Sequence, residues 1–358
     1  MMTAPVLPGQ LAVIEADLAD PAACARIEHW LADRADATPF HRPAWIKAVA
    51  RGNRQSAHML LVENAAGGIA GLLPLNLIHS PLFGRALVSS GFAVDGGILA
   101  DDALVADALA ARAIALARSW SAPTLELRGG RAPSSGFVTK TGAYLGFTRA
   151  LAGDDEAELR AIPRKHRAEL RKGLAHDFEF RIGSDPALRD HFHALYCRSV
   201  HNLGTPVFPR AMFEAVLDAF GADAEIGAVY HEGRPLSAIL SLVHGRAYMP
   251  YWQGADTEAR QARANEVAYF RLMGRARARG CTLFDFGRSK VGTGPALWKK
   301  SWGFEGAPLA YHVHAAPGHE PRDINPLSPQ YRRKIALWKA LPDAVADRLG
   351  PWIARGLG

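Results

Sequence analysis

Cysteine is scarce in this sequence. Its 358 residues include only Cys24, Cys197 and Cys281, an odd number without a C-x-x-C pair and without a known nucleophile motif. A chain of this length buries enough core to fold without disulfide bonds, and so few cysteines fit a reducing compartment. We therefore expect a cytoplasmic protein.

Long apolar runs are missing as well. The most apolar segment, IAGLLPLNLI at 69–78, is interrupted by Pro74 and Asn76. It is much shorter than the ~20 residues that a membrane-spanning helix needs. The first twenty residues carry acids where a secretory signal would have to be apolar. The sequence thus predicts a soluble protein, or one peripheral at the inner face of the membrane.

Several motifs of nucleotide, metal and nucleophile chemistry are incomplete. The DFG triplet at 285–287 lacks the other kinase motifs, and GTG at 292–294 is followed by Leu297 where a dinucleotide fingerprint needs its third glycine. No G-x-S-x-G elbow is present. His312 and His314 would share one face of a strand, but no third metal ligand is evident. We expect no metal and no tightly bound cofactor.

The net charge of +7 is unevenly distributed. Residues 1–150 hold 13 Lys and Arg against 12 Asp and Glu, whereas residues 151–358 hold 29 against 23. Such an excess either forms a solvated surface or favours an anionic partner of the second half.

Two passages, 58–130 and 224–290, predict the same order of elements: strand, tight turn, strand, strand, helix, strand. The turns are AAGG in one and EGRP in the other. Asp101 or Asp102 can cap the first helix. In the second helix, apolar residues recur at i, i+3, i+4 and i+7, namely Tyr269, Leu272, Met273 and Ala276. The architecture predicted is a tandem pair of α/β units with mixed sheets.

Helices are also predicted between and after these passages. Three lie between them, at 163–173, 185–204 and 209–221, the second with Asp185 and Pro186 in cap and first-turn positions. A Pro-rich connector follows residue 315, and then a tail helix at 331–341 and a shorter helix after Pro342.

The first of these helices is strongly basic. Arg164, Arg167 and Arg171 fall at i, i+3 and i+7 on one face. Five Lys and Arg in nine residues repel one another, and a bound anion would relieve this repulsion. Arginine favours bidentate contacts with phosphate or carboxylate. The face is either a phosphate-binding surface or simply solvated.

A second basic feature is the stretch 297–306, in which Lys299 and Lys300 lie among Trp298 and Trp302. A lysine head that aromatic rings partly desolvate interacts strongly with an anion or a developing oxyanion. The other interpretation is that the lysine stems cover the edge of a core.

These stretches carry a family likeness. PRKHRAELRKG at 163–173 resembles the arginine-rich helix entry of the Fem-type aminoacyltransferases. FDFGRS at 284–289, followed by LWKKSWGFEG at 297–306, resembles the carboxy-terminal signature of that family. HRPAWIKAV at 41–49 and GTPVFP at 204–209 extend the likeness. The branch that the chain resembles most is the FemAB-related one associated with exosortase (PEP-CTERM) exopolysaccharide loci.

The resemblance implies two GNAT-like domains, at 1–150 and 151–315, before the connector and helical tail at 316–358. It also implies an enzyme that transfers an acyl or aminoacyl group to an amine on an anionic, phosphate-bearing cell-envelope or exopolysaccharide precursor. By this resemblance, Lys299 lies near the reacting centre, and we expect Lys299 and Arg288 to be the catalytic residues that stabilise the oxyanion. The substrate-binding residues that we expect are Arg164, Arg167, Arg171, Lys290, Trp252, Trp298 and Trp302.

The donor stays open between aminoacyl-tRNA and acyl-CoA. The long coiled-coil arm that some Fem members insert in the second domain has no counterpart here. Likewise TEARQARANEV at 257–267 lacks the R/Q-x-x-G-x-G/A loop by which ordinary GNAT enzymes hold the coenzyme A pyrophosphate.

Two other functions fit the same residues. One is a non-catalytic GNAT-like module that binds RNA or an anionic polymer, because a basic surface with aromatic residues also suits nucleic acid. No RRM, KH or OB motif supports it, and we expect no DNA partner. The other is an acyl-CoA-dependent N-acetyltransferase of the same fold.

Overall fold

The computed structural model describes residues 11–80, 84–320 and 335–358. The chain forms two compact units: unit 1 comprises 1–141, 310–324 and 355–358, and unit 2 comprises 142–309 and 325–354. Each unit contains one mixed sheet with helices on both faces, so the predicted α/β class is confirmed.

Unit 1 has the strand order β1-β2-β3-β4-β6-β15-β7, with β5 paired to β3. Its strands are β1 (Val13–Glu15), β2 (Ser56–Glu63), β3 (Ile69–Ser80), β4 (Gly84–Val88), β5 (Leu99–Ala100), β6 (Thr124–Arg128), β7 (Val138–Lys140) and β15 (Tyr311–Ala315). Its helices are α1 (Pro21–Ala32), η1 (Pro39–His41), α2 (Pro43–Asn53) and α3 (Ala103–Ser119).

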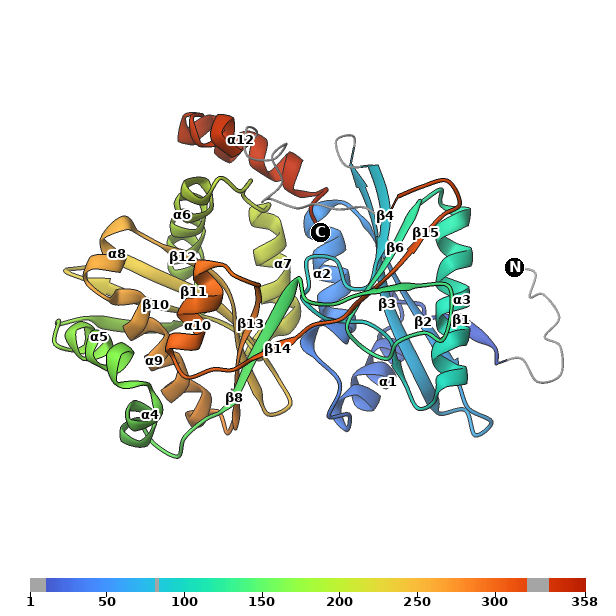
Figure 1. Cartoon of the computed structure of the whole chain (residues 1–358), viewed down its shortest axis with the longest axis horizontal. Helices are drawn as coiled ribbons and strands as arrows, with labels where there is room; N and C mark the ends of the chain where they lie inside the picture. Colours follow the sequence, from blue (N-terminus) through green and yellow to red (C-terminus); the bar gives the residue numbers. More distant parts are fainter. Residues whose placement is uncertain (1–10, 81–83, 321–334) are drawn as a thin grey trace. The chain divides into compact units, whose positions relative to one another are not determined.

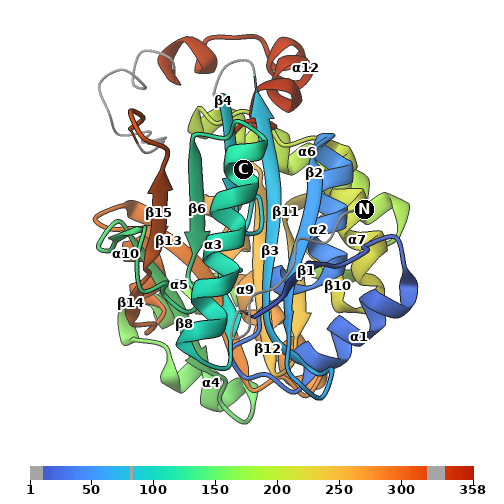
Figure 2. The same cartoon turned by 90° about the vertical axis from the view of Figure 1, so that its right-hand side faces the viewer.

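The two faces of the sheet in unit 1 bury separate cores, because successive side chains of a strand point to opposite faces. Leu73 of β3 packs in the core under α3, and its neighbour Leu72 packs in the core under α1 and α2. Figure 2 shows α3 across the near face of this sheet. The side chain of Asp102 accepts the hydrogen bond of Val105 N and caps α3, as predicted.

Unit 2 has the strand order β14-β8-β13-β12-β11-β10-β9. Its strands are β8 (Tyr144–Ala150), β9 (Glu179–Gly183), β10 (Ala224–His231), β11 (Arg234–His244), β12 (Ala247–Ala255), β13 (Leu283–Lys290) and β14 (Gly306–Pro308). Its helices are α4 (Asp155–Ala161), α5 (Arg164–Leu174), α6 (Pro186–Leu203), α7 (Arg210–Phe220), η2 (Gly221–Asp223), α8 (Thr257–Gln261), α9 (Ala264–Ala278), α10 (Gly294–Ser301) and α12 (Asp343–Ala354).

The helices of unit 2 cover both faces of its sheet (Figure 1). Leu272 of α9 shares a buried core with Ile239 of β11 and with Trp302, which follows α10. On the other face, the ring of Phe213 in α7 meets that of Trp252 in β12, with centroids 5.0 Å apart. The helices predicted at 163–173, 185–204 and 209–221 are confirmed as α5, α6 and α7.

The predicted tail falls partly outside the described residues. Residues 331–334 are not among them, whereas residues 335–339 are helical and α12 follows Pro342. Strand β8 lies in unit 2 and β15 lies in unit 1, so the compact units divide the chain at other places than residues 150 and 315. In the described ranges, no helix has both the length and the apolarity needed to cross a bilayer.

The repeat predicted from the sequence is present in both units, with one difference. Each unit has a run of antiparallel strands followed by a parallel pair, β4 with β6 and β12 with β13. In unit 1, however, β4 ends at Val88, and residues 89–98 form a loop before β5. This loop fills the space beside the parallel pair of unit 1, whereas the corresponding space in unit 2 is open.

Candidate active site

Strands β12 and β13 of unit 2 pair along only part of their length. Their parallel register contains Ala247 with Leu283 and Tyr248 with Phe284. Beyond these pairs the two strands part, and we call the facing edges of 249–255 and 285–290 the seam. Unpaired strand edges present backbone N–H and C=O groups that an extended ligand can hydrogen-bond.

A β-bulge flanks the seam on each side. On β12, Leu240 of β11 pairs with Trp252 and Ser241 pairs with Pro250, so Tyr251 is the additional residue. On β13 the register against β8 shifts between Asp285 and Arg288. Bulges bend a strand and redirect its side chains, and they are over-represented next to active sites.

The side chain of Lys299 is bound to the bulge of β13. Its Nζ donates to the carbonyl oxygens of Phe286 at 2.6 Å, Gly287 at 3.3 Å and Arg288 at 2.9 Å. These bonds engage all three protons of an ammonium group. Burial lowers the pKa of Lys299 to about 8, and the carboxylate of Asp285 opposes this shift.

The predicted role of Lys299 as an oxyanion donor therefore stays a prediction, and its amino group has a different set of partners here. Gly287 has a left-handed φ of +65°, which only glycine adopts readily. Its N–H donates to Asp285 Oδ1 at 2.7 Å. Lys299 and Asp285 together hold the bulge in this conformation.

A polar chain that the sequence did not reveal lies between β12 and α9. Tyr269 donates its hydroxyl proton to Gln253 Oε1 at 3.1 Å, and Gln253 Nε2 donates to Asn265 Oδ1 at 2.8 Å. Gln253 belongs to the seam segment of β12, so this chain ties the seam to the first turns of α9. The i, i+3 pattern of α9 predicted Tyr269 only as an apolar core residue.

The start of α9 carries an acid. Burial raises the pKa of Glu266, while hydrogen bonds from its own backbone N–H and from Trp298 act in the opposite direction. Arg263, which precedes α9, donates from Nε to Glu169 Oε2 at 2.7 Å. The positive end of the α9 helix, a place that favours anions, is thus covered by a carboxylate.

The start of α9 is electrostatically unfavourable for a coenzyme A diphosphate. The diphosphate would meet the carboxylate of Glu266 at short range, and the guanidinium of Arg263 is already engaged with Glu169. This agrees with the absence of the pyrophosphate loop from 257–267.

The structure brings together two of the three tryptophans predicted to bind substrate. Trp298 packs 5.7 Å from Trp302 and 5.0 Å from Tyr269, measured between ring centroids. Trp302 is fully buried and so is a core residue. Trp252 lies apart from both, against Phe213 on the opposite face of the sheet. The identity of an aromatic residue does not tell which face of a strand it occupies.

The predicted basic face of α5 is only partly open. Arg164 and Arg171 are exposed, and neither guanidinium group has a hydrogen bond or ion pair within the described ranges. Arg167 instead donates to the carbonyl oxygen of Arg160 at the end of α4, at 3.2 Å. Lys290 and Arg288 are half-buried in β13, where the guanidinium of Arg288 lies 4.6 Å from the ring centre of Tyr144.

Within the described ranges, the parallel pair of unit 1 has no comparable seam. After the last paired residue, Ser89 N donates to Glu126 O at 2.8 Å, and a parallel bridge joins Ile98 to Gly130. The guanidinium of Arg128, which is only 7% exposed, donates to Ala93 O at 2.9 Å and holds the loop from inside. The loop 89–98 therefore closes the space that is open in unit 2.

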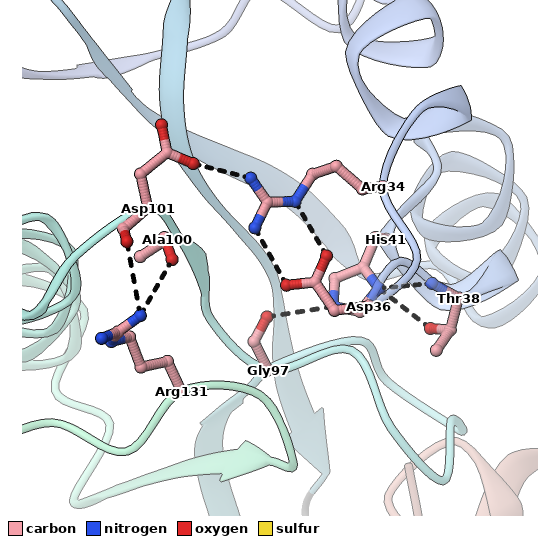
Figure 3. A network of polar contacts seen from close by, with 8 residues as sticks. All are labelled: Arg34, Asp36, Thr38, His41, Gly97, Ala100, Asp101 and Arg131. Carbon is pink, nitrogen blue, oxygen red and sulfur yellow. Dashed lines mark hydrogen bonds and ion pairs between the residues drawn. The ribbon is translucent and has the colours of Figure 1, made fainter.

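This loop is strained and braced. Ser90 and Phe92 have positive φ angles of 49° and 62°, which are costly for residues other than glycine. Figure 3 shows polar contacts at and beside the end of the loop. His41 Nε2 donates to Gly97 O at 3.2 Å, and the guanidinium of Arg34 links Asp36 with Asp101, which follows β5.

Comparisons with known proteins agree with this architecture. Residues 160–300, which contain the seam, match a family model described as an acetyltransferase (GNAT) domain. No curated protein sequence matches the chain.

The solved structures that are similar to the chain include FemX and two further proteins. FemX is 15% identical with a TM-score of 0.65, and the match covers 81% of this chain and 95% of FemX. A tandem GNAT protein from the clavulanic acid biosynthesis pathway is 13% identical with a TM-score of 0.57, covering 87% and 100%. The C-terminal domain of a putative lysylphosphatidylglycerol synthetase from Agrobacterium fabrum is 12% identical with a TM-score of 0.56, covering 82% and 92%. The chain thus has a fold of tandem GNAT-like units, the second of which contains the segment that matches the acetyltransferase (GNAT) model.

Proposed function

We propose that the chain is an acyltransferase that forms an amide at the seam of unit 2. The observation that carries this proposal is the parting of β12 and β13 after Tyr248 and Phe284, between two bulges, within the segment that matches the GNAT domain. The unpaired edges can bind the acyl chain of a donor as a third, short strand between them. The carbonyl carbon of the donor would then be held at the bulge of β13.

The donor that this geometry favours is an aminoacyl ester, as in aminoacyl-tRNA. Glu266 at the start of α9 disfavours a diphosphate there, as described above, whereas an ester donor places no phosphate beside its acyl group. A protonated α-amino group on the donor would also be attracted by the carboxylates near the seam, Glu266 and Asp285.

The reaction balances without a cofactor. The nitrogen of the acceptor amine attacks the carbonyl carbon of the donor, and the tetrahedral intermediate collapses with cleavage of the bond from carbon to the ester oxygen. The proton that the nitrogen loses passes to the departing oxygen, so the products are an amide and an alcohol. Correct orientation of two bound reactants supplies a large part of the rate in such transfers.

Lys299 enters this proposal as a positioning residue. Its ammonium fixes the carbonyl oxygens of Phe286, Gly287 and Arg288, and so fixes the edge of β13 along which the acyl group would lie. Arg288 is the nearer candidate for contact with the oxyanion, because its side chain leaves the same bulge and is only half-buried.

The acceptor that we propose is a phosphate-bearing precursor of the cell envelope or of an exopolysaccharide. Arg164 and Arg171 support it, because both are exposed on α5 and have no partner in the part of the chain that is described. Arginine side chains bind phosphate through two parallel hydrogen bonds. These two would anchor the acceptor at a distance from its reacting amine.

The double variant Arg164→Ala with Arg171→Ala is expected to bind inorganic pyrophosphate about tenfold more weakly at low salt, with a flatter salt dependence. Calorimetry at two salt concentrations measures this. The matched control is Arg112→Ala with Arg118→Ala, which removes the same charge from the exposed surface of α3. An unchanged salt response in the first variant would show that the arginine face is only solvated.

A donor screen tests the proposed function directly. Acetyl-CoA and a pool of aminoacyl-tRNAs are offered with amino-sugar acceptors, and amide formation is followed by mass spectrometry. We expect product from aminoacyl-tRNA and none from acetyl-CoA. Tight, salt-sensitive binding of tRNA without turnover of any donor would instead support the non-catalytic RNA-binding function.

A second candidate is an acyl-CoA-dependent N-acyltransferase, and the match of residues 160–300 to a GNAT acetyltransferase model favours it. In the same screen it predicts thiol release from acetyl-CoA. Glu266→Gln separates the two candidates further, since removing the negative charge at α9 would strengthen the binding of coenzyme A. The same change would weaken the binding of an aminoacyl ester, whose protonated α-amino group loses the attraction of this carboxylate.

A further inference from the structure

Helix α12, Asp343–Ala354, has its amphipathic pattern inverted. Its buried residues are small, namely Ala346, Gly350 and Ala354. Its large apolar side chains face outward: Val345 is 40% exposed, Leu349 45% and Trp352 50%. These three fall at i, i+4 and i+7 and form one stripe, which we call the α12 stripe. Large apolar residues that gather on one exposed face mark an interaction surface.

The small face of α12 is packed against unit 2, so the helix is not free to turn its stripe inward. A Cβ atom on Gly350 would lie 2.6 Å from Val207 Cγ1 and 2.9 Å from Val207 N. His201 of α6 pairs through Nδ1 with Asp343 at 2.7 Å. Close packing and this ion pair hold the stripe outward.

The charges around α12 select an anionic partner. Residues 335–358 contain three Lys and Arg, namely Lys339, Arg348 and Arg355, against two Asp. Both acids have partners on α6, since Asp343 pairs with His201 and Asp347 accepts the thiol proton of Cys197. Arg348, on the turn beside the stripe, is exposed. An excess of positive charge beside an apolar stripe fits an anionic lipid surface and disfavours a second, equally basic copy of the same helix.

We propose that α12 is an interfacial helix by which unit 2 binds the surface of a membrane that contains anionic phospholipid. The α12 stripe would lie at the boundary between headgroups and acyl chains, with Trp352 at the depth that tryptophan prefers. Lys339 and Arg348, which are both exposed, would contact the anionic headgroups. This proposal does not depend on the transfer reaction proposed above.

Co-sedimentation with vesicles tests the proposal. The full chain is expected to sediment with vesicles of mixed phosphatidylcholine and phosphatidylglycerol, and much less with phosphatidylcholine alone. Changing Val345, Leu349 and Trp352 together to serine should weaken binding to the mixed vesicles at least about tenfold. The matched control changes Leu104 and Val138, exposed apolar residues of unit 1, to serine and should bind as the unchanged protein does.

Two results would overturn the proposal. One is undiminished vesicle binding by the triple variant. The other is a chain that is dimeric by light scattering without lipid and becomes monomeric in the triple variant, since the stripe would then be covered by a second copy. Hydrogen exchange on the unchanged chain needs no variant: vesicles should slow exchange across 343–354, and unchanged exchange there would also contradict the proposal.

Discussion

Replacing Lys299 by methionine is expected to lower the rate of transfer by about 10²-fold, because misplacing a reactive edge by about 1 Å has an effect of that size. Methionine removes the three hydrogen bonds that hold the carbonyl oxygens of the β13 bulge. Steady-state kinetics with the donor found in the screen measures the loss. Lys300→Met is the matched control, since Lys300 is exposed on the same helix. Equal turnover in both variants would contradict the assignment.

Lys299→Met should also change how the free energy of unfolding depends on pH. Burial lowers the pKa of Lys299 from 10.5 to about 8. Between these values the unfolded chain holds more protons than the folded chain, so this group makes the free energy of unfolding increase with pH, by at most about 1.4 kcal/mol per unit. In Lys299→Met this increase should vanish, which urea titrations at pH 7 and pH 10 would detect.

The rate of turnover should fall as pH rises over the same range, whereas the free energy of unfolding increases. Above about pH 8 the neutral amine of Lys299 has only two protons for three carbonyl oxygens. The bulge then loses one of its restraints, and we expect the rate of the unchanged enzyme to fall as pH rises through this value. A rate profile that Lys299→Met leaves unaltered would mean that another group titrates.

Gly254→Ala is expected to destabilise unit 2 by about 3 kcal/mol, the upper end of typical overpacking costs. A Cβ atom at this position of β12 would lie 2.2 Å from Tyr196 N and 2.5 Å from the carbonyl carbon of Leu195. These are backbone atoms of α6, which cannot turn aside as a flexible side chain can, so the helix must move from the sheet.

Urea unfolding followed by circular dichroism measures the effect at Gly254. Gly153→Ala is the control, because a Cβ atom there would meet nothing within 4 Å. We expect the control to stay within about 0.5 kcal/mol of the unchanged protein. A Gly254→Ala variant as stable as this control would show that α6 is not held against β12 as described.

Elements whose signals are local could be predicted from the sequence. The caps at Asp102 and Asp185 and the 3.6-residue periodicity of α9 depend on neighbours in the chain, so their helices were correctly predicted. The loop 89–98 was not. Its conformation depends on Arg128 and on the bridge from Ile98 to Gly130, more than thirty residues further on, and no local pattern indicates such contacts.

The site shows the same limit. The aromatic setting of Lys299 drew attention to the right side chain, but the carbonyl oxygens that it binds depend on a bulge formed by strand pairing. Trp252 was predicted to bind substrate together with Trp298, but its side chain packs against α7 on the opposite face of the sheet. Its direction depends on the alternation of side chains along β12. The acid at Glu266 becomes noteworthy only once the fold buries it beside Trp298.

Because loop 89–98 closes the space beside β4 and β6 in unit 1, it determines how many donor molecules one chain can bind in the proposed reaction. Two repeats with open seams would load two acyl groups on each chain, and the occupancy of one could influence the other. With Ser89 bonded to Glu126 and Ile98 bridged to Gly130, the residues that the structure describes keep such a place in unit 2 alone. Donor saturation curves should then be hyperbolic, with one equivalent bound per chain, although the sequence contains the fold twice.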